Sequence, residues 1–234
     1  MKKQSTYSVL MLIGMLLAAA APAAADISVQ CPGDKDNDGV SDTPGIVCIH
    51  LASGDGFVQM ANFDPATGRR KLQYIFGFSD VTNALKALKP PERKDPAKVT
   101  QTIIQAGQLA ANFPAPTIAV NEGEHVYLNL SNVGFVKRPD LFDPHTVHWH
   151  GFPQTGAIFD GLPESAIAIN VLGTATYYYQ PLDPGTYMYH CHAEATEHMQ
   201  MGMLANLYVR PKQNGTSKVY NGRTYTKFVY NDGD

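Results

Sequence analysis

From about residue 101 onward, the alternation of apolar and polar positions is that of a β-rich domain. Apolar and polar residues alternate over 125–130, and tyrosines crowd 174–179, which is typical of strands. The segments predicted as strands are 125–130, 174–179, 186–192 and 204–209. No internal repeat is visible, and about 110 residues suffice for one β-sandwich with its own core. We therefore expect a single all-β domain over residues 101–212.

Residues 26–100 lack this regular pattern and are expected to form an irregular N-terminal extension. A short helix is predicted around Val81 to Leu88. The basic cluster from Lys86 to Lys98 also contains two prolines and acidic residues, so a solvated linker explains it better than a binding surface.

The C-terminal residues 213–234 are assigned to the start of a following segment. Within them, Lys218 to Tyr230 is rich in β-forming residues and predicts a hairpin or strand with Asn221-Gly222 at its turn. A hairpin that leads nowhere suggests a truncated chain, or a subunit completed by a separate polypeptide.

Residues 1–25 have the pattern of a secretory signal peptide. Lys2 and Lys3 precede an apolar run from Val9 to Leu17, and small residues up to Ala25 supply a cleavage site. The run is short for a membrane span, and a lone N-terminal anchor is the alternative. We expect a secreted, periplasmic or cell-surface protein with no membrane span after cleavage.

Removing that segment takes away two lysines and no acidic residue, so the formal charge moves from -3 to -5. Binding to nucleic acid needs a concentrated basic face. The charge distribution therefore argues against a nucleic-acid partner.

Six of the eight histidines and one of the three cysteines lie in two short stretches, 145–150 and 190–198. An electron-transfer copper takes two imidazoles, a thiolate and a weak axial thioether, because soft sulfur stabilises Cu(I). The residues that supply this set are His145, Cys191, His198 and Met203. Zinc could bind cysteine and histidine in a closed tetrahedral site, but an axial methionine favours copper.

The remaining histidines form two His-x-His pairs, His148/His150 and His190/His192. On a strand, residues i and i+2 point to the same side, so each pair can bind copper from one face. Cys191 lies between the histidines of the second pair, and its thiolate should point to the opposite face. An electron arriving at Cys191 would have a short covalent route to a second copper site.

Three motifs indicate a family. They are Phe113-Pro114-Ala115-Pro116-Thr117-Ile118, His148-Trp149-His150-Gly151 and Gly185-Thr186-Tyr187-Met188-Tyr189-His190-Cys191-His192. Because of these motifs, the stretch from Gln101 to Pro211 resembles a cupredoxin domain of the multicopper oxidases. This laccase-like family oxidises substrates at a blue (type 1) copper and reduces dioxygen at a trinuclear copper cluster. The resemblance implies a cupredoxin-like Greek-key β-sandwich.

The chain departs from the first domain of ordinary laccases, which has His-Ser-His at the second motif and no blue copper. Here Cys191 replaces that serine, so a blue copper belongs in this domain. His198 follows Cys191 at a longer distance than in common laccases, while the step from His198 to Met203 is the family's. We interpret this as a longer ligand loop.

The resemblance also implies a partner. The family's trinuclear cluster takes eight histidines, four from each of two domains, and this chain supplies only His148, His150, His190 and His192. Dioxygen, a small-molecule or metal-ion reductant, and a second cupredoxin domain or subunit are then expected, with Cys191, His190 and His192 as catalytic candidates. The chain is similar to large bacterial multicopper oxidases associated with manganese or iron oxidation. The alternatives are a single-domain blue-copper electron carrier, or a periplasmic copper-binding protein without turnover.

The two remaining cysteines, Cys31 and Cys48, are left as a disulfide pair in an oxidising compartment, with two free thiols as the alternative. Between them, acidic residues at alternate positions and a glycine at the sixth match the first half of a calcium loop. The candidate ligands are Asp34, Asp36, Asp38 and Asp42. Gly45 stands where a bidentate glutamate is expected, so an ordinary Asp/Gly-rich surface loop is an equal alternative.

Overall fold

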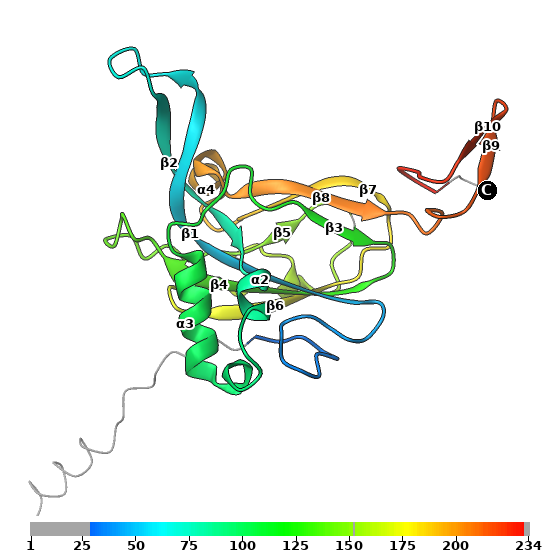
Figure 1. Cartoon of the computed structure of the whole chain (residues 1–234), viewed down its shortest axis with the longest axis horizontal. Coiled ribbons are helices and arrows are strands. Elements are labelled where there is room, and N and C mark those ends of the chain that lie inside the picture. The colour runs from blue at the N-terminus through cyan, green and yellow to red at the C-terminus, as the bar shows by residue number, and fades with distance from the viewer. Residues whose placement is uncertain (1–28, 152, 232–234) are drawn as a thin grey trace, which may run out of the picture.

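The computed structural model describes residues 29–151 and 153–231, which form two stacked β-sheets with helices along one side (Figure 1). One sheet has the strand order β2-β1-β4-β6, the other β3-β8-β7-β5, and β9 and β10 form a separate hairpin. The strands are β1 (Ile46–Phe63), β2 (Arg70–Asp80), β3 (Ile118–Asn121), β4 (His125–Gly134), β5 (His148–Trp149), β6 (Thr174–Tyr179), β7 (Gly185–His190), β8 (Leu204–Arg210), β9 (Lys218–Tyr220) and β10 (Arg223–Tyr225). The helical segments are α2 (Thr82–Lys86), η1 (Glu92–Lys94), α3 (Pro96–Gly107), η2 (Ala157–Phe159) and α4 (Ala195–Met201). The all-β sandwich expected from the sequence is confirmed.

The core lies between the two sheets and follows the predicted alternation. Along β8, alternate residues are buried and the intervening ones face solvent or the rim. The fully buried side chains of β4 oppose them from the other sheet. Each completely buried aliphatic side chain contributes about 1.5–3 kcal/mol through the hydrophobic effect. These packed faces hold β7 and β5, the strands that carry the histidine motifs, in fixed register.

Residues 46–80 differ from the irregular extension that the sequence predicted. β1 pairs antiparallel with β2 and, on its other side, parallel with β4, with Ile46 opposite His125 and Leu51 opposite Leu130. Leu51 faces the main core, so this part of the chain belongs to the same sandwich as residues 101–212. The expected boundary at residue 101 therefore does not separate two structural units. Parallel pairing between distant segments leaves no local sequence signal, which explains the difference.

A helical layer covers the outer face of the β1–β4 pair. α2 confirms the short helix predicted around Val81 to Leu88, whereas α3 was not predicted. Asp95 caps α3 by accepting hydrogen bonds from the backbone N–H groups of Ala97 and Lys98, and Pro96 occupies the first turn. Ala52 of β1 packs with the helices in a second apolar cluster. The segment expected to be a linker therefore shields one side of the sheet.

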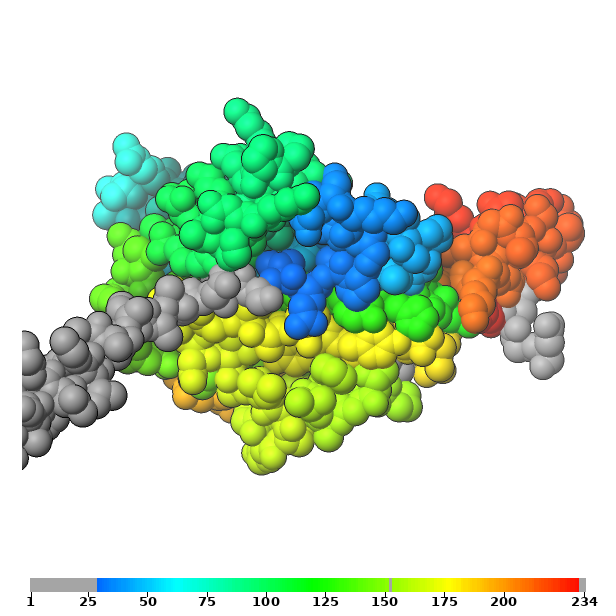
Figure 2. Space-filling view, turned by 90° about the horizontal axis from the view of Figure 1, so that it is seen from below, coloured from blue at the N-terminus to red at the C-terminus, as the bar shows by residue number. Residues whose placement is uncertain are grey.

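The C-terminal hairpin is confirmed by β9 and β10, which pair antiparallel with Arg223 opposite Tyr220. Asn221 and Gly222 have φ values of 49° and 74°, the left-handed conformation that a tight two-residue hairpin turn requires. The hairpin projects from the end of the sandwich (Figures 1 and 2). Its tyrosines at 220 and 225 are exposed.

The disulfide between Cys31 and Cys48 is confirmed, with Cα atoms 5.6 Å apart. It ties the N-terminal segment to β1. The blue surface of that segment adjoins the green surface of the helices in Figure 2. A cross-link closing a loop of sequence separation 17 stabilises the fold by about 3 kcal/mol through the entropy of the unfolded chain.

We expect the double variant Cys31→Ala/Cys48→Ala to lose about 3 kcal/mol of unfolding free energy, because its unfolded chain regains the freedom of that loop. Denaturant unfolding of both proteins, with and without reductant, measures the loss. Reductant should destabilise only the wild type. If wild type and variant had the same denaturant midpoint without reductant, the cross-link would add nothing to the unfolding free energy.

The predicted signal peptide, residues 1–25, lies outside the described residues. Across residues 29–151 and 153–231, the structure contains no helix with the length and apolar character that a membrane crossing demands.

Candidate metal centre

Two neighbouring strands bring the histidine motifs together. β5 pairs antiparallel with β7, so that His148 lies opposite His190 and Trp149 opposite Tyr189. His145 precedes β5 and is held by two backbone hydrogen bonds to Ile169. The two motifs thus meet at one end of the sheet, although His145 and His190 are 45 residues apart in sequence.

One group of side chains is completely buried between the sheets. The sulfur of Cys191 lies 3.3 Å from Nδ1 of His198 and 3.8 Å from Nδ1 of His145. All three side chains are inaccessible to solvent, as is Met203. The backbone N–H of Cys191 donates to the carbonyl of Met203. This hydrogen bond places the methionine, which immediately precedes β8, beside the cysteine. The structure brings the four expected blue-copper ligands into one region.

The longer ligand loop that follows Cys191 contains the short helix α4, and His198 lies within that helix. Glu194, at φ 49°, turns the chain into α4, whose His198 points back to the sulfur. The helix stops at Gly202, where φ is +130° and a Cβ would lie 2.6 Å from the carbonyl oxygen of Phe76. Only glycine fits this close approach. The extra residues therefore change the path of the loop and keep the imidazole beside the thiol.

Burial shifts the pKa values of His145 and Cys191. It lowers the pKa of His145 well below its usual value, with the neighbouring His198 as a second cause. Burial also raises the pKa of the Cys191 thiol to about 11. A metal ion must therefore displace the thiol proton when it binds, whereas His145 is already neutral. A soft metal that stabilises the thiolate fits this donor set.

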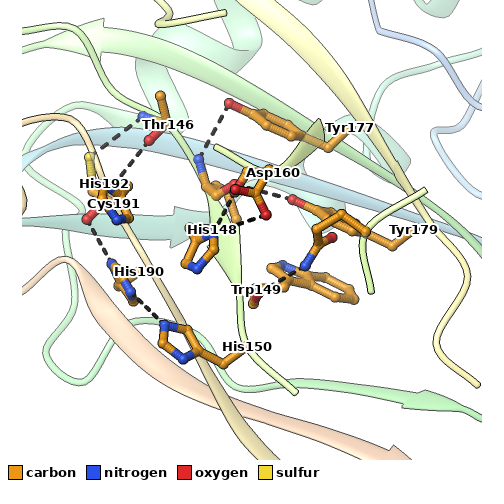
Figure 3. Close-up of polar contacts among 12 residues, drawn as sticks. Thr146, His148, Trp149, His150, Asp160, Tyr177, Tyr179, His190, Cys191 and His192 are labelled. Carbon is orange, nitrogen blue, oxygen red and sulfur yellow. Dashed lines mark hydrogen bonds and ion pairs between the residues drawn. The ribbon is translucent and has the colours of Figure 1, made fainter. Parts of the chain in front are cut away.

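Thr146 connects the two ligand segments, and sequence reasoning missed it. Its backbone N–H donates to the Cys191 sulfur at 3.5 Å. Its hydroxyl oxygen accepts hydrogen bonds from the backbone N–H groups of His192 and Ala193, at 3.0 and 3.3 Å (Figure 3). One threonine thereby fixes the segment that contains both the cysteine and the second histidine pair. Its position next to His145 was the only signal available in the sequence.

The other four histidines gather on the opposite side of Cys191 (Figure 3). Nε2 of His150 and Nε2 of His190 are 2.9 Å apart, and His148 offers a nitrogen within 4.8 Å of both. The ring of His192 lies 5.2 Å from that of His148 and 5.6 Å from that of His190. His150 is exposed, so this group opens to the surface. The alternation predicted around Cys191 is therefore seen in the structure.

Backbone carbonyls orient two of these rings. Nδ1 of His190 lies 2.8 Å from the carbonyl oxygen of Cys191, and Nδ1 of His148 contacts the carbonyl of Asp160. A carbonyl only accepts, so each Nδ1 holds the proton and Nε2 keeps the lone pair that can bind a metal. In His190 that lone pair accepts from the Nε2–H of His150 at 2.9 Å. Burial, followed by the neighbouring histidines, lowers the pKa of His150. Imidazole nitrogens with a lone pair at Nε2, as in His148 and His190, are donors that fit copper.

The Asp-rich loop differs from both copper-type groups. Carboxylates of Asp34, Asp36 and Asp42 come within 4.8 Å of one another, but Asp38 is not in the group. Asp34 accepts hydrogen bonds from the backbone N–H groups of Asp38 and Gly39, and Asp36 pairs with Arg93 at 2.6 Å. The loop's carboxylates are thus occupied by its own backbone N–H groups and by Arg93, as in an Asp/Gly-rich surface loop. The structure gives no support to calcium.

Two histidines outside the motifs, and the tryptophan within one of them, have packing roles. His50 is buried and contacts the carbonyl of Gly39, while His125 contacts the hydroxyl of Tyr178 at 2.6 Å. Trp149 stacks on Tyr179 with ring centroids 4.0 Å apart. These side chains have structural partners of their own and lie outside both ligand groups.

A β-sandwich with a buried cysteine and histidine group on one side of a strand and a histidine cluster on the other defines a cupredoxin-type metal-binding domain. A protein-family model described as multicopper oxidase matches residues 92–214, and the chain belongs to this family. The family comprises copper-dependent oxidoreductases, and copper is its cofactor.

The chain is 35% identical over 111 residues to an L-ascorbate oxidase from Cucurbita pepo var. melopepo, covering 45% of this chain and 18% of that protein. It is 25% identical over 158 residues to multicopper oxidase MmcO from Mycobacterium tuberculosis, covering 63% and 29%. Among solved structures, a blue copper oxidase from Nitrosomonas europaea is 28% identical, with a TM-score of 0.47 and coverage of 70% of this chain and 38% of the other. The chain thus spans less than a third of the length of these two curated relatives.

Proposed function

We propose that this chain is the blue-copper domain of a copper-dependent oxidoreductase. The observation that supports this most directly is the buried group in which the Cys191 sulfur lies 3.3 and 3.8 Å from two histidine Nδ1 atoms. Together with Met203, these residues would hold a type 1 copper. Bound copper supplies one-electron redox chemistry at this group and dioxygen reduction at a completed cluster.

The four remaining histidines would form half of the oxygen-reducing site. His148, His150 and His190 place their nitrogens within 4.8 Å of one another, the ring of His192 lies beside them, and exposed His150 opens the group to the surface. A second cupredoxin domain or subunit would supply the other half. Because Cys191 is covalently bonded to both His190 and His192, the backbone gives a short route for electrons between the two groups. These three residues are the proposed catalytic residues.

The chain's other residues keep the buried group dry and ordered. The core excludes water from Cys191, and Thr146 fixes both ligand segments through its hydrogen bonds. A dry, preorganised site favours rapid electron transfer, because little has to rearrange around the changing charge. Electrons would come from a small-molecule or metal-ion reductant, with dioxygen as the final acceptor.

The expected compartment agrees with this proposal. A disulfide closes the N-terminal segment, and disulfides persist in oxidising compartments. A secreted, periplasmic or cell-surface location also gives access to dioxygen and external reductants.

The absorption spectrum of the oxidised, copper-loaded protein tests this function. We expect an intense visible band from thiolate-to-copper charge transfer. A near-ultraviolet shoulder from a bridged copper pair would show in addition that chains or partners complete the cluster, which makes an oxidase. The visible band alone would indicate a blue-copper electron carrier or an isolated half of the oxidase, and no visible band would overturn the proposed site.

A further inference from the structure

A fully buried carboxylate lies away from both ligand groups. Asp55 of β1 has no exposed surface, and its two oxygens accept three hydrogen bonds. Oδ1 accepts from the backbone N–H of Val136 at 3.1 Å, and Oδ2 from the backbone N–H of Lys137 at 2.7 Å. The hydroxyl of Tyr74 donates to Oδ2 at 2.9 Å. A buried carboxylate is tolerated only when its oxygens are satisfied in this way.

Residues 135–137, whose backbone is hydrogen-bonded to Asp55, include an aromatic ring that lies against the buried cysteine and histidine group. Phe135 immediately precedes the two amides held by Asp55, and its ring lies 5.4 Å from that of His145. Phe76 stacks on Phe135 with ring centroids 4.1 Å apart and an interplanar angle of 15°. The ring of Phe76 also lies edge-on to His198 at 6.0 Å. The stacked pair therefore contacts both imidazoles of the group.

The same pair of strands supplies the carboxylate and one of these rings. Asp55 on β1 lies directly opposite Phe76 on β2 in the antiparallel register. The two side chains consequently project from one face of the sheet toward the 135–137 segment. Asp55 fixes the backbone of that segment, and Phe76 fixes its ring.

We propose that Asp55 is a positioning residue for the blue-copper site, acting through Phe135 and Phe76 to hold His145 and His198 in their ligand geometry. This inference rests on the proposed function of the His145, Cys191 and His198 group. Asp55 does not touch that group itself. Its contribution is to prevent the 135–137 segment, and with it the ring against His145, from moving.

Substitution of Asp55 by asparagine removes this clamp without changing the size of the side chain. An amide has one oxygen and one NH₂ group, so one of the two backbone N–H donors then faces another donor. The segment must shift to relieve that clash. Tyr74→Phe is the matched control, since it removes only the phenol donor and leaves both backbone hydrogen bonds to Asp55.

The test compares wild type, Asp55→Asn and Tyr74→Phe after loading with Cu(II). Visible absorption and the copper hyperfine splitting in electron paramagnetic resonance report ligand geometry, and competition with a chelator reports affinity. We expect Asp55→Asn to change the hyperfine splitting and weaken copper binding by about tenfold to a hundredfold, as loss of an outer-shell support does. Tyr74→Phe should retain the wild-type spectrum.

Two further proteins separate positioning from general destabilisation. The Cys31→Ala/Cys48→Ala variant loses stability through a distant cross-link and should keep the wild-type copper spectrum. Phe135→Leu leaves the carboxylate and its hydrogen bonds in place but removes the ring, and should reproduce the spectral change even where Asp55→Asn does not fold.

A wild-type spectrum and affinity in Asp55→Asn, or in Phe135→Leu where the former does not fold, would overturn the positioning role while leaving the blue-copper proposal intact. A wild type without a visible copper band would overturn both.

Discussion

Replacing Cys191 by serine is expected to abolish the visible absorption of the copper-loaded protein and any oxidase activity with it. The thiolate is both the proposed chromophore and the covalent link to His190 and His192. A serine hydroxyl is a hard oxygen donor that neither stabilises Cu(I) nor gives the intense sulfur-to-copper transition. Absorption of the oxidised protein after copper loading measures the effect, and the band should disappear entirely.

Met203→Leu is the matched control for this experiment, because it changes another buried sulfur in the same core. The thiolate and both imidazoles remain, so the visible band should persist. The reduction potential should rise, since a thioether favours Cu(II) more than a leucine that cannot coordinate. A visible band that survived in Cys191→Ser would show that the proposed ligand set is wrong.

Replacing His148 by alanine is expected to abolish oxygen reduction and to leave the visible blue-copper band unchanged. His148 lies in the surface-facing group, where its ring is 4.8 Å from His150 and 5.3 Å from His190. Its loss should leave the buried blue-copper site intact and eliminate oxygen reduction in the assembled enzyme. Copper content per chain should fall, and any near-ultraviolet shoulder should be lost.

His125→Ala provides the control, because His125 is a histidine of the same domain that contacts Tyr178 and belongs to neither group. It should change neither copper content nor dioxygen consumption. Visible absorption and dioxygen uptake, measured on wild type and both variants, distinguish the two outcomes. Disappearance of the blue band in His148→Ala would mean that the roles of the two histidine groups are misassigned.

The local patterns predicted much of this fold. Alternation identified β4, the tyrosine run identified β6, and the Asn221-Gly222 turn identified the last hairpin. These signals are local, because each depends on residues that are neighbours in sequence. The placement of the β1–β2 hairpin in the sheet was not predicted, since it joins the sandwich through the long-range pairing of β1 with β4.

The same distinction applies to the site. The motif residues could be selected by their chemistry, and the structure brings Cys191 beside His145 and His198 as expected. Thr146 and Asp55 could not be selected, because they act through backbone amides of residues far away in sequence. Neither a threonine before a strand nor an aspartate within one has a sequence pattern that predicts such a contact.

The parallel pairing of β1 with β4 has a consequence for how this protein is made. During synthesis, β1 and β2 leave the ribosome as a hairpin well before β4 is complete, so one long edge of β1 has no partner for that interval. Exposed edges of this kind recruit strands from other chains, and pairing across such a distance is intrinsically slow. We expect chains interrupted before residue 134 to aggregate, whereas longer ones can close the sheet.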